Sequence, residues 1–152
     1  MNLACDPVRG LESCGYTERE AAFLYLVGMH SGYFLRRQFL AFIHRQDGAI
    51  VQGFLQKSDR LGHVSSIAYQ QQRHIYHLKA KSIYGLLGQP DSQNRREKGD
   101  RQIKLGLMQL DYVIGHFGCR FLETGQQKVE FFREKFGIAL TALPQLLSLI
   151  HI

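Results

Sequence analysis

The chain has 152 residues, of which 45% are hydrophobic and 21% charged, with a formal net charge of +6 at pH 7. These values are typical of one globular domain with the beginning of a second. No apolar run approaches the roughly 18 residues that a membrane-spanning helix needs, and the N-terminal segment lacks the basic start and apolar core of a secretory signal. We therefore expect a cytoplasmic protein that does not enter a membrane.

The positive charge is concentrated in the middle of the chain. Residues 33–104 contain thirteen Lys or Arg and five Asp or Glu, a net charge of +8, whereas the rest of the chain carries −2. Such asymmetry favours a polyanionic partner. The alternative is a basic face that is merely solvated.

The first predicted element is a helix that follows an irregular start. Residues 1–16 show no periodicity and are predicted to form a flexible arm. Thr17 and Glu20 form a capping box, in which each side chain satisfies a backbone amide at the start of a helix. Apolar residues then recur at helical spacing, which predicts a helix over Glu18–His30.

A second and a third helix are predicted to follow, separated by a turn at Gln46-Asp47-Gly48. The second helix covers Phe34–Arg45, and the third covers Ala49–Leu61. The second is expected to bury the stripe Leu35, Phe39, Phe42 and Ile43 and to expose Arg36, Arg37 and Gln38. The third is expected to bury Val51, Phe54, Leu55 and Leu61 and to expose Gln52, Gln56, Lys57 and Arg60.

Beyond Gly62 the apolar period changes from helical to alternating, which predicts two strands over His63–Tyr69 and Arg73–Lys79. They form a β-hairpin with a polar tip, and Lys81–Leu87 forms a short helix. The expected fold class is mainly α with a small β-hairpin, arranged as a winged helix-turn-helix over residues 17–88.

The remainder is predicted to form a linker and an extension. Residues 89–100 are polar and basic, with Arg95 and Arg96, and are typical of a linker. Residues 101–146 contain helices over 101–117 and Gln126–Phe136 and a short strand over Arg120–Glu123. This part is either a helical extension, which offers a homodimer interface through residues 101–136, or the truncated start of a second domain.

The last six residues, Leu147-Ser148-Leu149-Ile150-His151-Ile152, resemble the conceptual translation of a transposon-end adapter used in sequencing-library preparation. We expect the natural protein to diverge near Leu146, and residues 147–152 are excluded from functional reasoning. Recovering the same six codons from an adapter-free library would reject this expectation.

The exposed residues of the second and third predicted helices, the hairpin and the linker suit double-stranded DNA. Glutamine offers a donor and an acceptor together to adenine in the major groove, and Gln52 and Gln56 lie one helical turn apart on one face. Positive side chains suit phosphates. The proposed DNA-binding residues are Arg36, Arg37, Gln52, Gln56, Lys57, Arg60, Arg73, Arg95 and Arg96. The alternatives are that Arg36 or Arg37 pairs with Glu18 or Glu20, and that the other exposed side chains are simply solvated.

Several kinds of chemistry have no support in the sequence. The three cysteines, Cys5, Cys14 and Cys119, lack metal-ligand spacing. His74 and His77 would point to opposite faces of a strand. Phosphate-binding and nucleophile motifs are missing. We therefore expect no catalysis, no metal and no cofactor.

The order of elements resembles a winged-helix DNA-binding domain over Thr17–Gly88. The segment GAIVQGFLQKSDRLGHV matches the recognition helix, glycine stop and first wing strand, and HIYHLKAKSIYGLLG resembles the second wing strand and following helix of replication-relaxation-type proteins of plasmids and other mobile elements. Ser58 departs from the usual large apolar residue. The resemblance implies a transcriptional regulator or a replication or mobilisation accessory protein. The alternatives are a protein-interaction module and the targeting domain of a truncated larger enzyme.

Overall fold

The computed structural model describes residues 5–46, 48–69, 73–116, 119 and 121–142. The chain divides into two compact units, residues 1–116 and residues 117–152, which are described separately. No helix in the described ranges is long and apolar enough to cross a membrane.

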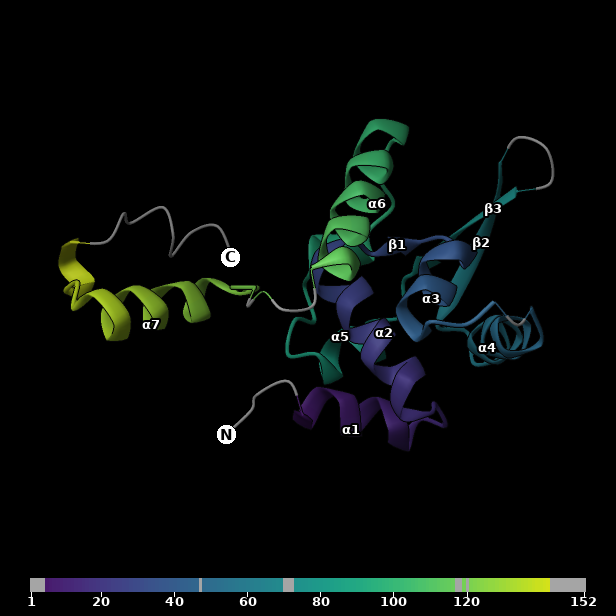
Figure 1. Ribbon diagram of the computed structural model, residues 1–152, viewed down its shortest axis with the longest axis horizontal. Coiled ribbons are helices and arrows are strands. Elements are labelled where there is room, and N and C mark those ends of the chain that lie inside the picture. The colour runs from purple at the N-terminus through teal and green to yellow at the C-terminus, as the bar shows by residue number, and fades with distance from the viewer. Residues whose placement is uncertain (1–4, 47, 70–72, 117–118, 120, 143–152) are drawn as a thin grey trace. The chain divides into compact units, whose positions relative to one another are not determined.

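Among its described residues, the first unit has six α-helices; its middle part, residues 18–78, contains three of them and a three-stranded antiparallel sheet, in the predicted order of helix, helix, helix and hairpin with a short strand after the first helix (Figure 1). The strand order is β1-β3-β2, so that the first strand pairs with the last and the hairpin projects beyond the helices. The predicted fold class, mainly α with a small β-hairpin, is confirmed. The elements in chain order are α2 (Glu18–His30), β1 (Tyr33–Phe34), α3 (Arg36–Ile43), α4 (Gly48–Arg60), β2 (Val64–Tyr69) and β3 (Arg73–Leu78).

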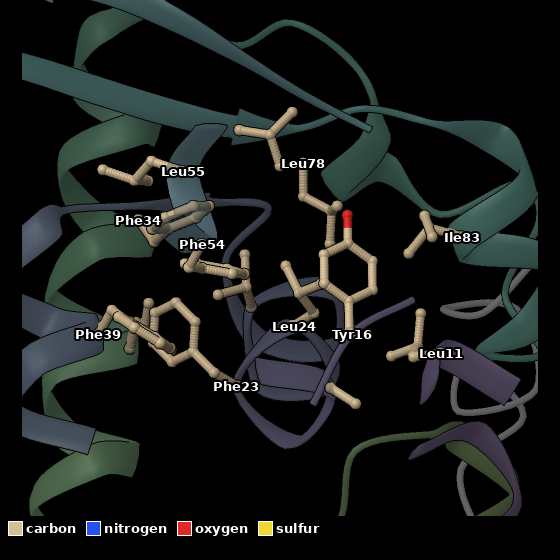
Figure 2. Packing of buried hydrophobic residues seen from close by; sticks show 14 of the residues in the cluster. Leu11, Tyr16, Phe23, Leu24, Phe34, Phe39, Phe54, Leu55, Leu78 and Ile83 are labelled. Atoms are coloured by element: carbon tan, nitrogen blue, oxygen red, sulfur yellow. The ribbon is translucent and has the colours of Figure 1, made fainter. Parts of the chain in front are cut away.

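Aromatic rings hold these elements together (Figure 2). Phe23 of α2 is fully buried, and its ring centroid lies 5.3 Å from Phe34 of β1, 5.1 Å from Phe39 of α3 and 6.1 Å from Phe54 of α4. Edge-to-face pairs at these distances stabilise a core beyond the area they bury. One side chain of α2 therefore fixes the strand and both later helices against one another.

The second helix was predicted to begin at Phe34, which is two residues too early. Tyr33 and Phe34 are a strand that pairs with His77 and Tyr76 of β3, and α3 begins only at Arg36. The Gln38 side chain accepts a hydrogen bond from the Leu35 amide at 2.8 Å and so caps the helix. Gln38 is completely buried, and its predicted exposure is wrong.

The helix α3 ends earlier than predicted because His44 takes the left-handed conformation, with φ of 55°. The amide of Arg45 then donates to the Leu40 carbonyl, which closes the last turn. Asp47, in the predicted turn, lies outside the described residues.

The expectation of a flexible arm is wrong for Cys5–Ser13, which forms α1. This helix packs against α2 and α5 (Lys81–Leu86), and Leu11 is fully buried between them. Pro7 lies in the first turn, where a helix tolerates the missing amide.

Residues predicted as a linker lie against the sheet. They contain the short 3-10 helix η2 (Gln93–Arg95) and lead into α6 (Asp100–Gly115). The Asn94 side chain donates to the Gly28 carbonyl at 3.0 Å, and the Lys98 amide donates to the Tyr33 hydroxyl at 3.0 Å. The helix α6 itself packs against α2, α3 and β1. Residues 89–116 thus belong to the same unit as the winged helix.

The second unit contains α7 (Gly125–Phe136) and the 3-10 helix η3 (Leu140–Ala142). Thr124 and Gln127 form a capping box at the start of α7, and Gly137 ends it with φ of 64°. Phe121–Glu123 is not a strand, in contrast to the prediction, because no neighbouring strand pairs with it among the described residues. Arg120 and the predicted adapter-derived tail, residues 147–152, lie outside those residues.

Candidate nucleic-acid interface

The helix α4 is amphipathic, and its exposed stripe carries both glutamines singled out by the sequence. Val51, Phe54, Leu55 and Ser58 are buried. Ser58 faces the core after all, and its hydroxyl donates to the Leu55 carbonyl at 3.0 Å. This bond satisfies a buried polar group without a partner from another element. The exposed residues recur at three- and four-residue spacing: Ala49, Gln52, Gly53, Gln56, Asp59 and Arg60. Leu61, predicted to face inward, follows the helix and is 39% exposed.

A shallow groove separates α4 from the wing, the β2–β3 hairpin. From α4 it is lined by Gln52, Leu55, Gln56 and Asp59, and from the wing by Val64, Ser65, Ser66 and Tyr76. Partial burial raises the pKa of the Tyr76 phenol, so this ring stays neutral at physiological pH. The lining has amides, hydroxyls and one carboxylate but contains no lysine or arginine.

Arg36 and Gln52 are brought together at the junction of α3 and α4. The Arg36 guanidinium donates a hydrogen bond to Oε1 of Gln52 at 3.4 Å, and both side chains are exposed. The pairing of Arg36 with Glu18 or Glu20, considered from the sequence, does not occur among the described contacts. Arg36 instead places a positive charge at one end of the α4 groove.

Arg37 is held by another helix. Its two terminal nitrogens donate to the two carboxylate oxygens of Asp111 on α6, at 2.8 and 2.9 Å. The hydrogen bonds from Arg37 hold the pKa of the Asp111 carboxyl below its usual value, and the same pairing raises the pKa of the guanidinium. Arg37 is consequently paired within the protein, with 63% of its side-chain surface exposed.

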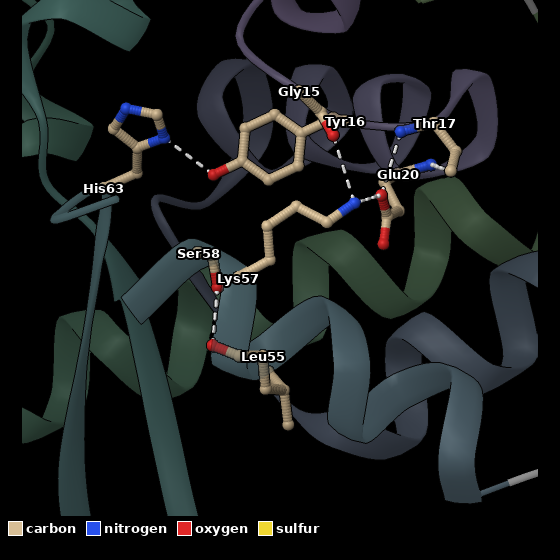
Figure 3. Close-up of polar contacts among 8 residues, drawn as sticks. All are labelled: Gly15, Tyr16, Thr17, Glu20, Leu55, Lys57, Ser58 and His63. Atoms are coloured by element: carbon tan, nitrogen blue, oxygen red, sulfur yellow. Dashed lines mark hydrogen bonds and ion pairs between the residues drawn. The ribbon is translucent and has the colours of Figure 1, made fainter. Parts of the chain in front are cut away.

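Lys57 is turned away from the exposed stripe of α4 (Figure 3). Its ammonium donates to Oε1 of Glu20 at 2.6 Å and to the Gly15 carbonyl at 3.1 Å, and it lies 5.6 Å from the centroid of the Tyr16 ring. Glu20 also caps the Thr17 amide of α2 at 2.8 Å. The Lys57 side chain therefore links the end of α4 to the start of α2, and the prediction that it is exposed on the outer face of the helix is wrong.

The Tyr16 ring extends this link to the wing. Its hydroxyl lies 2.6 Å from Nδ1 of His63, just before β2. Burial raises the pKa of the Tyr16 phenol and lowers the pKa of His63. Nδ1 of a neutral His63 can then accept a hydrogen bond from the Tyr16 hydroxyl, which fixes the base of the wing to the helices.

Arg60 and Arg73 remain exposed, as predicted. Arg60 ends the outer face of α4, and Arg73 begins β3 opposite Tyr69, in the last pair of the hairpin. Neither forms an ion pair within the part of the chain that the structure describes. Arg60 is available to phosphates beside α4, whereas Arg73, four residues before His77 on β3, shares the sheet face of His77 at the far end of the hairpin.

Arg95 and Arg96 lie on the other side of the sheet. Because strand side chains alternate, Phe34 and Tyr76 face the core, whereas Tyr33 and His77 stack on the opposite face with ring centroids 4.1 Å apart. The segment with Arg95 covers that face, where the Asn94 carbonyl lies 3.1 Å from Nε2 of His77. The structure does not bring these arginines to the α4 groove.

The two histidines of β3 point to different surroundings. His77 is buried against Tyr33, and this burial lowers its pKa, whereas His74 is exposed with its ring 6.3 Å from Tyr76. Across the described residues, no three His, Cys, Asp or Glu side chains lie close enough together to hold a metal ion.

No protein-family model matches the sequence, and neither a curated protein nor a solved structure shows significant similarity to this chain. The described residues are mainly α-helical with a small three-stranded antiparallel sheet.

Proposed function

We propose that this chain binds double-stranded DNA without catalysis, with α4 in the major groove and the wing against the flanking DNA. The observation that carries the proposal is the exposure of Gln52 and Gln56 together on α4, in a groove beside a projecting hairpin. The Gln56 amide can meet a base edge in the geometry that adenine requires, and the exposed Gln52 amide can do so beside its hydrogen bond from Arg36. The second helix of a helix-turn-helix presents its outer face to DNA in this way.

None of the residues that line the groove is a lysine or an arginine, and the exposed arginines of this part of the chain lie outside it. Arg36, Arg60 and Arg73 are exposed, with Arg36 beside Gln52, Arg60 at the end of α4 and Arg73 at the far end of the wing, and the groove itself offers neutral polar groups and a carboxylate. This separation suits DNA, because contacts of positive side chains with phosphates position a protein, whereas contacts of polar side chains with base edges determine which sequence it binds. We therefore reduce the proposed phosphate contacts to these three arginines and omit Arg37, Lys57, Arg95 and Arg96.

A titration of duplex DNA at two salt concentrations tests the proposal. If three arginines neutralise phosphates, the logarithm of the binding constant should fall with the logarithm of salt concentration with a slope of about −3. Fluorescence anisotropy of a labelled duplex measures this slope directly. Failure to bind any duplex at low salt would reject DNA binding.

A protein-interaction module is the second candidate, and a specific surface favours it. The helix α6 exposes Leu105, Met108 and Tyr112 at 51%, 59% and 57%, and their spacing places them on one face. This stripe suits an apolar partner or a second copy of the chain, as in a homodimer through residues 101–136. Sedimentation of the wild-type chain and of Met108→Glu distinguishes self-association, which the new charge should weaken, from a monomer.

We further propose that the protein acts as a transcriptional regulator, or as a replication or mobilisation accessory protein of a mobile element. The support is the winged-helix connectivity together with the resemblance of the wing and following helix to replication-relaxation-type proteins. The alternative is a targeting domain of a larger enzyme. A search for bound sites across the host genome would favour regulation if they fall in promoters, and an accessory role if they fall at a replication or transfer origin.

A further inference from the structure

The outer face of α4 carries an acidic residue beside the two glutamines. Asp59 is exposed, lies seven residues after Gln52 and three after Gln56, and lines the same groove. A carboxylate near DNA is repelled by the phosphates, so its presence on this face requires a compensating interaction. The groove supplies no lysine or arginine to neutralise it.

Asp59 is also free to accept hydrogen bonds. Neither Asp59 nor Gln56 has a side-chain hydrogen bond or ion pair with any other described residue. An ionised carboxylate only accepts hydrogen bonds. In the major groove, only the amino groups of cytosine (N4) and adenine (N6) donate, whereas guanine and thymine present acceptors there.

Gln52, at the other end of the stripe, is biased in the opposite sense. Its Oε1 already uses one of its two lone pairs to accept a hydrogen bond from Arg36 at 3.4 Å, which leaves its amide nitrogen as the donor that faces a ligand. Along α4 the groove thus offers a donor at Gln52, a donor and acceptor at Gln56, and an acceptor at Asp59. Seven residues of helix rise about 10 Å, which is close to three base-pair steps.

We infer that Asp59 is a specificity-determining residue, which selects a base with an exocyclic amino group, cytosine or adenine, at one end of the site that α4 reads. The inference rests on the proposed function and adds to it which end of α4 meets the base with an exocyclic amino group. Asp59 raises specificity at the expense of overall affinity, because the carboxylate is tolerated only where an amino group meets it and is repelled elsewhere.

The test compares base preferences of the wild type and of Asp59→Asn, measured by selection from a randomised duplex library at one fixed salt concentration. The asparagine is nearly the same shape but adds a donor, so guanine and thymine become acceptable. We expect the wild type to discriminate roughly 5- to 150-fold at one base pair and the variant to lose this preference while preferences at neighbouring pairs persist. Because Asp59 is exposed, the variant should retain its fold, which circular dichroism checks.

Asp91→Asn is the matched control, since it removes the same charge from an exposed position in the segment before η2. It should leave the base preferences of the wild type unchanged. Identical preferences for the wild type and Asp59→Asn would overturn the inference, as would a wild type that binds DNA with no base preference. A wild type that binds no DNA at low salt would instead refute the proposed function itself.

Discussion

The carboxylate of Asp111 accepts hydrogen bonds from both terminal nitrogens of Arg37, at 2.8 and 2.9 Å, and a third from the buried amide of Gln38, at 3.0 Å. Gln38 in turn caps the start of α3 through the Leu35 amide. A single acid on α6 therefore fixes the first turn of α3, the helix that supports α4.

Replacing Asp111 should loosen this junction. Asp111→Ala is expected to lower the free energy of unfolding by about 1 kcal/mol, because the partly exposed ion pair contributes little and the bond to Gln38 contributes the rest. Urea denaturation measures the change, and Gln109→Ala, an exposed site on the same helix, is the control. Since the pKa of Asp111 is lowered in the folded state, its contribution exists above the unfolded pKa and should disappear as the pH falls through the folded pKa. Equal urea midpoints for Asp111→Ala and wild type at pH 7 would contradict the role of Asp111.

Lys57 and Arg60 are neighbours on α4 with different expected effects. Lys57→Met should lower the free energy of unfolding by about 1–2 kcal/mol, because the largely buried Glu20 loses a charged partner. It should leave the salt dependence of DNA binding unchanged. Arg60→Met should have little effect on the free energy of unfolding, but it should reduce the slope of the logarithm of the binding constant against the logarithm of salt concentration by about 1. A weaker salt dependence of DNA binding for Lys57→Met than for wild type would show that Lys57 contacts phosphates.

Gly106 lies where α6 crosses the end of α2. A Cβ at this position would lie 3.0 Å from Oγ of Ser31 and 3.3 Å from its carbonyl oxygen, so Gly106→Ala should cost about 1–3 kcal/mol through overpacking. Gly53→Ala on α4, where a Cβ meets nothing within 4 Å, should instead stabilise by about 0.5–1 kcal/mol through helix propensity. Thermal unfolding compares the two variants. A stabilising Gly106→Ala would show that the two helices can separate at no cost.

His77 should make stability depend on pH. Burial lowers its pKa below the ordinary value of 6.5, so the unfolded chain binds a proton at a higher pH than the folded chain does. The sign follows from linkage: the contribution is complete above about pH 6.5 and is lost as the pH falls toward the folded pKa. Urea midpoints between pH 7.5 and 5.5 should fall less steeply for His77→Asn than for wild type. An unchanged slope for His77→Asn would contradict the assignment. His63, whose pKa is also lowered by burial, should contribute to the slope that remains.

The glutamines and the wing arginine should affect DNA binding differently. Gln52→Ala and Gln56→Ala are expected to relax sequence preference, with a loss of about 1–3 kcal/mol on the preferred duplex and little loss on random duplexes. Arg73→Ala should weaken binding to all duplexes alike. Anisotropy titrations on the two kinds of duplex separate these outcomes. Equal losses of binding free energy on the preferred and the random duplexes for both glutamine variants would show that α4 does not contact the base edges.

Local signals in the sequence were sufficient where an element depends on its own residues. The range predicted for α2 agrees with the structure because the Thr17–Glu20 capping box and helical spacing mark it unambiguously. By contrast, β1 is only two residues long and exists through its pairing with β3, more than forty residues later. The nine-residue α1 presents too few apolar residues to show a period.

The candidate site was anticipated in part for the same reason. The exposure of Gln52 and Gln56 follows from helical periodicity alone. The orientation of Lys57 does not, because it is set by Glu20, thirty-seven residues earlier, and by the Gly15 carbonyl. The position of Asp59 on the same face as the glutamines was implied by its spacing from Gln52 and was missed in the sequence interpretation.

The close approach of Asn94 to Gly32 has a practical consequence for dissecting this protein. At Gly32, with φ of 79°, no side chain fits, because Asn94 occupies the space where a Cβ would be. An expressed fragment that ends at residue 88 would leave the Tyr33–His77 stack uncovered and would lack the helix that holds Arg37 and Gln38. The shortest piece expected to fold independently therefore runs from α1 through residue 116, rather than stopping after the wing.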